Sequence, residues 1–208
     1  MGGYRQRRFA HSAAIRLMQT IQTLVAELTS GDDHRAEAAV HALKAHGPAA
    51  VAALNSLTTS EDADTRWWAL RTLAEIPDIE VGDYLILGLE DADIAVQQCA
   101  ALGLRQRPDE YAIPELIALL DHQDRLLTRL CADALIALGE KATQSLISVL
   151  DHGSQSARLE AVRALATIGD RNSISALFKV SEEDSQILQY WAGVGLDNMG
   201  IGMSFFKP

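Results

Sequence analysis

The stretch KATQSLISVLDHGSQSARLEAVRALATIG, residues 141–169, decides the fold of this chain. Leu146 and Leu150 mark one apolar stripe at helical spacing, and Ala161 and Leu165 mark a second. The stretch therefore predicts two amphipathic helices joined by a short polar turn. A helical hairpin of this size cannot bury both stripes by itself, so it needs a similar neighbour on each side.

The same unit recurs along nearly the whole chain. The leucine of the second helix returns every 30 or 31 residues, at Leu43, Leu73, Leu104, Leu135, Leu165 and Leu196. The leucine of the first helix keeps the same period, at Leu24, Leu54, Leu85, Leu116, Leu146 and Leu177. A small residue stands four positions before each second-helix leucine, where it permits close helix packing, and Gly or Pro stands four positions after it, where it ends the helix. Both helices thus predict six repeats.

The repeat carries a recognisable motif. Residues 157–169 resemble the pattern D-x-x-V-R-x-x-A-A-x-A-L-x-x-x-G, residues 96–104 keep a degraded form of it, and residues 113–121 supply an I-P-E-L-I-x-L-L-D stretch. At these residues the chain resembles HEAT repeats of the short type first noted in phycobilisome lyases, over roughly residues 18–200. The resemblance implies an all-α, right-handed α-α superhelix (solenoid) of about six HEAT-like hairpins. The motif arginine is kept only at Arg66 and Arg158, so any Asp–Arg ladder between repeats is expected to be partial.

The repeat also sets the expected organisation of the chain. Residues 1–8 are polar and basic and are expected to form a disordered N-terminal tail, residues 9–200 the solenoid, and residues 201–208 an apolar C-terminal tail. The tail either folds back over the last repeat or docks on another chain in a hetero-oligomer. Folding back is favoured, because pairs of aromatic residues are uncommon on the surface of soluble monomers.

Charge and composition exclude several classes of function. The net charge of the chain is −10. Its first eighteen residues carry a charge of +4 and contain no acid, so residues 19–208 carry −14. A surface this acidic argues against nucleic acid as a partner. No apolar run is long enough to span a membrane, and no secretory signal is evident. Cys99 and Cys131 form no C-x-x-C pair, which favours reduced thiols in a cytoplasmic protein.

The turns inside the hairpins are acidic, and we expect them to cap helices. Asp accepts hydrogen bonds from the free amides at the start of a helix, and the spacing in these turns lacks the alternating ligands of a calcium loop. We therefore expect no metal site here.

In HEAT-like solenoids the second helices line the concave side, so candidate binding residues are those that point away from the core there. At about 100° per residue, these are the positions two, five and six before each second-helix leucine. They gather all three tryptophans of the chain among apolar residues and arginines, the side chains that anchor interfaces. The candidate binding residues are Trp67, Trp68, Arg71, Cys99, Leu102, Arg129, Leu130, Asp133, Arg163, Tyr190 and Trp191. The alternative is that these side chains pack between neighbouring repeats.

Two functions remain open. The first is a protein-binding scaffold or assembly factor without catalytic residues or cofactor, whose concave face takes an acidic or amphipathic segment of another protein. The second, implied by the resemblance, is a bilin lyase or bilin-handling subunit, with a tetrapyrrole in the groove and Cys99 as a candidate thiol. The sequence shows no nucleophile beside a base, so it favours a protein that is not an enzyme, and a lyase if it is one.

Overall fold

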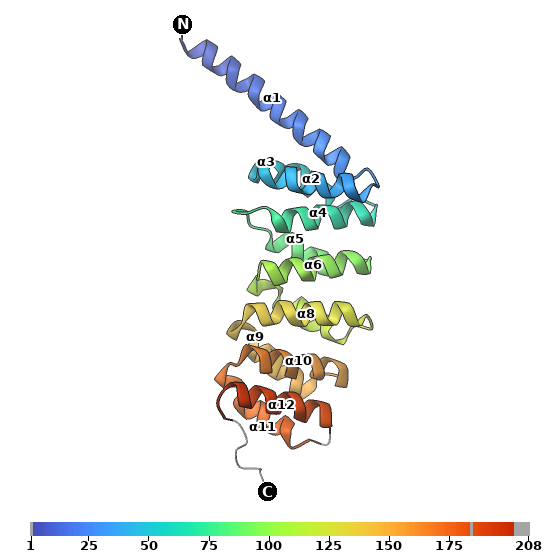
Figure 1. Cartoon of the computed structure of the whole chain (residues 1–208), viewed down its shortest axis with the longest axis vertical. Coiled ribbons are helices and arrows are strands. Elements are labelled where there is room, and N and C mark those ends of the chain that lie inside the picture. Colours follow the sequence, from blue (N-terminus) through green and yellow to red (C-terminus); the bar gives the residue numbers. More distant parts are fainter. Residues whose placement is uncertain (1, 184, 202–208) are drawn as a thin grey trace. The chain divides into compact units, whose positions relative to one another are not determined.

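The computed structural model describes the backbone of residues 2–183 and 185–201, and the side chains of residues 11–183 and 185–201 (Figure 1). Within these ranges the chain is all-α and contains twelve α-helices and no strand. The expected fold class, a solenoid of HEAT-like hairpins, is confirmed. The tail after Ile201 lies outside the described residues, so its docking stays a prediction.

The helices follow one another as the six expected hairpins. Each first helix of a pair holds the earlier leucine of the repeat and each second helix the later one. The pairs are α1 (Gly2–Leu28) with α2 (Asp33–His46), α3 (Pro48–Leu57) with α4 (Ala63–Glu75), α5 (Gly82–Leu89) with α6 (Ile94–Gln106), α7 (Ile113–Ala118) with α8 (Arg125–Leu138), α9 (Glu140–His152) with α10 (Gln155–Ile168), and α11 (Ile174–Ser181) with α12 (Gln186–Asn198).

The hairpins are divided between two compact units, residues 1–84 and 85–208, and the boundary falls inside α5. In the N-terminal unit α1 packs on α2 and α3, and α4 packs on both of these helices. In the C-terminal unit the second helices α6, α8, α10 and α12 lie in successive layers, each in contact with the next (Figure 1).

The repeated leucines form the core of both units. All six second-helix leucines are buried, and so are the first-helix leucines from Leu54 to Leu177, whereas Leu24 on the terminal helix α1 is only half-buried. The small residues four positions earlier are buried too. A close approach between two second helices occurs at Gly195 on α12, where an added Cβ would lie 2.9 Å from the Cα of Ala166 on α10.

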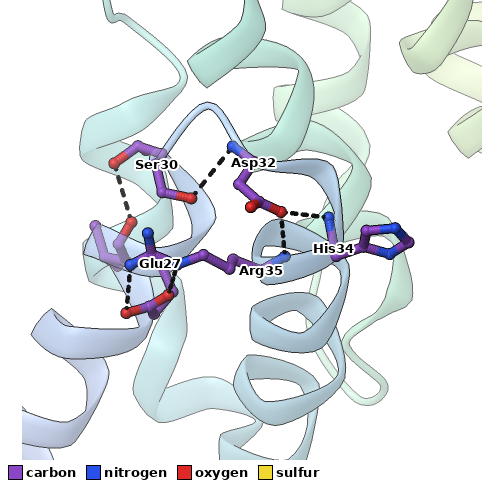
Figure 2. A network of polar contacts seen from close by, with 7 residues as sticks. Glu27, Ser30, Asp32, His34 and Arg35 are labelled. Atoms are coloured by element: carbon purple, nitrogen blue, oxygen red, sulfur yellow. Dashed lines mark hydrogen bonds and ion pairs between the residues drawn. The ribbon is translucent and has the colours of Figure 1, made fainter.

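The helix α1 begins before residue 9, where the solenoid was expected to start. It is one helix from Gly2 to Leu28, so residues 2–8 continue it rather than form a separate disordered tail. Gln and Arg are good helix formers, and no proline interrupts this segment. At its other end α1 is tied to α2 (Figure 2): Arg35 donates from Nε and Nη2 to the Glu27 carboxylate at 2.5 and 2.9 Å. Hydrogen bonding to Arg35 holds the pKa of Glu27 below its usual value.

Candidate functional site

Acidic side chains cap four of the six second helices, as expected from the sequence, whereas a serine caps α10 and α12 has no side-chain cap. The N-caps are Asp32, Asp62, Asp93, Asp124 and Ser154, each of which accepts a hydrogen bond from an amide of the following turn. Bonds from the Thr65 hydroxyl and amide lower the pKa of Asp62, and the Leu127 amide followed by the Gln98 side chain lowers the pKa of Asp124. Among the described residues no cluster of His, Cys, Asp or Glu could hold a metal ion.

A second set of polar side chains closes four of the six hairpins from within. They stand seven positions before the second-helix leucine, at Arg66, Gln97, Arg158 and Gln189. Arg66 donates to the Ser60 carbonyl at 2.8 Å, Gln97 to that of Asp91 at 2.8 Å, Arg158 to that of Leu150 at 2.8 Å, and Gln189 to that of Glu183. Glutamine therefore replaces the motif arginine in two repeats and makes the same kind of bond.

In the N-terminal unit, the outward face of the second helices is a closed cluster of charged and aromatic side chains. Arg71 on α4 donates to Glu37 on α2 at 2.7 Å, and its guanidinium carbon lies 5.6 Å from the ring centroids of both Trp67 and Trp68. The two rings meet edge to face with their centroids 4.8 Å apart. Trp68 is only 6% exposed. The cation and the aromatic rings of this face are thus already engaged with one another.

In the C-terminal unit, the middle of the corresponding face is a chain of ion pairs. Arg163 on α10 donates to Asp133 on α8 at 3.0 Å and to Glu160 on its own helix at 2.8 Å. With Arg163 only 5% exposed, its charge is neutralised by these two acids. Arg129, one turn before Asp133 and 3.7 Å from it, keeps a side chain that is 51% exposed. On this face Arg129 is an arginine that remains open to a ligand.

Around these charges the face of the C-terminal unit exposes large apolar side chains. Tyr190 on α12 is 61% exposed and meets Trp191 edge to face at 5.5 Å, while Leu102 on α6 is also exposed. Leu126 on α8 and Ile187 on α12 are also exposed, nine positions before their repeat leucines and outside the positions two, five and six. The helical period alone predicts this exposure. Nine residues are two and a half turns, so a residue nine positions before the leucine lies on the side of the helix opposite to it, as the residue two positions before does.

A groove of about 350 Å³ runs across the same face. It lies between the N-terminal halves of α8, α10 and α12. Its lining is Arg125, Thr128, Gln155, Ser156, Leu159, Glu160, Ile187 and Leu188. We call this groove, together with Leu102, Leu126, Arg129 and Tyr190, the open face.

The predicted binding residues thus divide into three groups. Leu102, Arg129 and Tyr190 are exposed, whereas Trp67, Arg71, Leu130, Asp133 and Trp191 are half-buried. Trp68, Cys99 and Arg163 are buried, as the packing alternative predicts for them. The reason differs between them: Trp68 is covered beside Trp67 and Arg71, and Arg163 turns toward acids on the neighbouring repeat.

Cys99 lies on α6 and Cys131 on α8. Both are buried, and burial raises the pKa of the Cys131 thiol to about 12. The thiolate is the reactive form, so Cys131 is inert near neutral pH. Cys99, the candidate thiol of the lyase hypothesis, is covered on α6.

A larger hollow of about 570 Å³ lies on the other side of the C-terminal unit, between the first helices α7 and α9. Ile113, Ile117, Val149 and His152 are among its lining residues. Its described lining contains no lysine or arginine. The open face is the better candidate site because it combines apolar side chains with exposed cations.

These features define an all-α helical-repeat solenoid whose second helices carry the candidate site. Residues 82–152 match the family model described as HEAT repeats, and residues 157–179 match that of the PBS lyase HEAT-like repeat. The resemblance inferred from the motif is confirmed. None of the described helices is long and apolar enough to cross a membrane.

Comparison with known proteins gives more particular relatives. The chain is 36% identical over 103 residues to a phycobilisome maturation protein of Synechococcus elongatus, covering 48% of this chain and 49% of that protein. It is 38% identical over 106 residues to a phycocyanobilin lyase subunit beta of Pseudanabaena tenuis, covering 48% and 36% of the two chains. The chain thus spans half or less of the length of these relatives.

A solved structure supports the fold. In the complex of CpcE and CpcF of phycocyanin lyase from Nostoc sp. PCC7120, the matched chain superposes with a TM-score of 0.57 at 22% identity. The match covers 71% of this chain and 98% of that chain. At this identity the likeness establishes a common fold.

Proposed function

We propose that this chain is a bilin-handling subunit of the phycocyanobilin lyase type, which holds a linear tetrapyrrole on the open face of its C-terminal unit. The observation that carries the proposal is the 36% and 38% identity to a phycobilisome maturation protein and a phycocyanobilin lyase subunit beta. A generic scaffold has no such specific support. The fold shared with the CpcE and CpcF complex is consistent with the proposal.

The chemistry of the open face suits such a ligand. A bilin is a flat conjugated molecule with carboxylate side chains, and small-molecule sites combine apolar walls with a few well-placed polar groups. Tyr190, Leu126 and Ile187 offer exposed apolar surface to the pyrroles. Arg129 offers a guanidinium that can pair with a carboxylate. The interior pair of Arg163 and Asp133 fixes the spacing of α8 and α10 beneath.

In this proposal the chain binds and orients the bilin, and the reacting groups come from the bilin and its acceptor protein. The burial of Cys131 supports this division of roles, since its thiol, with a pKa of about 12, supplies almost no thiolate at neutral pH. A phycobiliprotein that receives the bilin is the partner we expect.

The alternative is an assembly factor that binds a phycobiliprotein without any bilin. The similarity to a phycobilisome maturation protein favours it as the second candidate. The same face, with exposed Tyr190 and Leu102 around Arg129, would then be a protein interface of aromatic and arginine anchors.

A binding experiment separates the two functions. The purified chain is titrated with phycocyanobilin, and the visible absorption spectrum is recorded for the wild type, Tyr190→Glu and Arg129→Gln. The matched controls are Tyr111→Glu and Arg171→Gln, which change an exposed tyrosine and an exposed arginine on the first-helix side of the same unit. We expect a spectral shift in the wild type and both controls, and a Kd raised about tenfold or more in the two face variants.

The opposite results are equally informative. No spectral change in the wild type, combined with retention of a phycobiliprotein that Tyr190→Glu loses, would establish the assembly factor instead. Equal bilin affinity in the face variants and the controls would show that the bilin does not bind at the open face.

A further inference from the structure

The groove of the open face has a positive charge that the protein itself does not neutralise. Arg125, the first residue of α8, is the only lysine or arginine in the described lining, and it makes no ion pair with any described residue. Glu160 is the only acid in that lining, and its carboxylate accepts from Arg163 Nε at 2.8 Å. The charge of Glu160 is therefore matched within the protein, and that of Arg125 is not.

The acid next to Arg125 in the sequence is also engaged elsewhere. The Asp124 carboxylate accepts hydrogen bonds from the Leu127 amide at 2.7 Å and from the Gln98 side chain at 3.0 Å. These bonds hold it as the N-cap of α8 and tie it to α6. The guanidinium of Arg125 is thus exposed and open to an anion from outside.

A second arginine stands one helical turn further along the same side of α8. The side chain of Arg129 is 51% exposed, and its Nε lies 3.7 Å from the Asp133 carboxylate, beyond hydrogen-bond distance. Asp133 accepts instead from Arg163 Nη2 at 3.0 Å. Two cations four residues apart repel each other, and a cation at the beginning of a helix opposes the helix dipole. An anion that bridges Arg125 and Arg129 relieves both unfavourable placements.

We propose that the open face takes a ligand with two acid groups, one paired with Arg125 and the other with Arg129. This inference rests on the proposed function and assigns the two carboxylates of the bilin. At 1.5 Å per residue, the two arginines are about 6 Å apart along α8. A linear tetrapyrrole carries a propionate on each of its two inner rings, so both carboxylates lie on one edge of the molecule within reach of such a pair. Each guanidinium can hold a carboxylate through two parallel hydrogen bonds.

The arginine pair also determines which way round the ligand lies. Its carboxylate edge follows α8, so its rings extend across the groove toward α10 and α12. Leu126 stands between the two arginines in the sequence and is 55% exposed, while Leu159 on α10 and Ile187 on α12 supply apolar surface further across. The reverse orientation would place the carboxylates against the α10 wall, where the charged lining residue is Glu160.

The test compares the bilin with and without its negative charges. Phycocyanobilin and its dimethyl ester are titrated into the wild type, Arg125→Gln, Arg129→Gln, the double variant and the control Arg171→Gln, with the visible absorption spectrum as the readout. For the free acid we expect each face variant to raise Kd about tenfold and the double variant about a hundredfold. For the ester we expect a higher Kd in the wild type and the same Kd in every variant. Added salt should weaken binding of the acid more than binding of the ester.

A loss of folding would not produce this pattern. Arg125→Gln removes a cation from the start of a helix and puts a good helix former in its place. It should therefore unfold in urea at the same midpoint as the wild type or at a higher one. Any loss of affinity in this variant then reports on the ligand and not on the fold.

The outcomes separate this inference from the proposed function. An Arg125→Gln protein that binds the free acid as tightly as the wild type, while Arg129→Gln does not, would overturn the two-point contact and leave the proposed function standing. Equal losses for acid and ester would also overturn it, because the arginines would then act on the shape of the groove. A wild type that shows no spectral change with the free acid would remove the proposed function, and the arginine pair with it.

Discussion

The second-helix faces of the two units use the same kinds of residue to opposite effect. In the N-terminal unit, Trp67, Trp68 and Arg71 close on one another and on Glu37. In the C-terminal unit, Tyr190, Leu126 and Arg129 stand open around the partly buried ion pair of Arg163 and Asp133. Arg71 and Arg163 occupy the same position of the repeat, and each pairs with an acid on the preceding second helix. Position in the repeat thus determines which way a side chain points, and its neighbours determine whether it is available.

The contrast is tested most strongly by placing a charge on each face. Trp68→Glu should cost about 3 to 5 kcal/mol or more, because it removes a buried indole and buries a carboxylate. Tyr190→Glu should change the free energy of unfolding by less than about 0.5 kcal/mol, as surface substitutions do. Urea unfolding of both variants measures this, and comparable losses would mean that the two faces are equally closed.

The next largest effect concerns the core beneath the open face. Leu135→Ala should destabilise the chain by about 2 to 5 kcal/mol, since Leu135 is fully buried. Leu102→Ala, two positions before the equivalent leucine on α6, should stay below about 1 kcal/mol because Leu102 is exposed. Equal losses at the two sites, seen in the same unfolding experiment, would place Leu102 in the core.

Smaller effects are expected from the paired arginines. Arg163→Gln leaves Asp133 and Glu160 close together in a mostly covered site, so we expect a loss of about 2 to 3 kcal/mol. Arg71→Gln should cost about 1 kcal/mol or less, because its pair with Glu37 is partly exposed to solvent. A double-mutant cycle with Asp133→Asn isolates the coupling on α8 and α10, and a coupling near zero would contradict the buried pair.

The smallest effect should not distinguish the units at all. The folded-state pKa values of Asp62 in one unit and Asp124 in the other are both lowered, so their capping stabilises the fold above the ordinary Asp pKa of about 4 and is lost as pH falls below it. Asp62→Asn and Asp124→Asn should each flatten this dependence slightly, as followed by circular dichroism during acid titration. Stability that rises on acidification would contradict the sign.

The fold could be predicted almost entirely from the sequence. The leucine period, the small residues before it and the acidic caps are local patterns, and each has one physical explanation. The start of α1 is less predictable, because arginine and glutamine are compatible with either a disordered tail or a helix. The repeat gave no reason to decide between them at residue 8.

The candidate site was only partly predictable. Helical period correctly placed Arg129, Leu102 and Tyr190 on an exposed face. It did not separate them from Trp68 and Arg163, because their burial depends on side chains of neighbouring turns and repeats, such as Trp67, Asp133 and Glu160. The exposed Leu126 and Ile187 stand nine positions before their repeat leucines, about one turn beyond position six.

The hairpin-closing bonds of Arg66, Gln97, Arg158 and Gln189 have a consequence for tracing descent in such proteins. A repeat with glutamine in place of arginine at this position keeps the hydrogen bond that closes the hairpin, but it no longer has the arginine by which the motif is recognised. Counting repeats by that arginine alone would find two where four are closed by a side chain of this kind. Substitution at this position of the repeat can therefore remove the sequence motif while the hairpin stays closed.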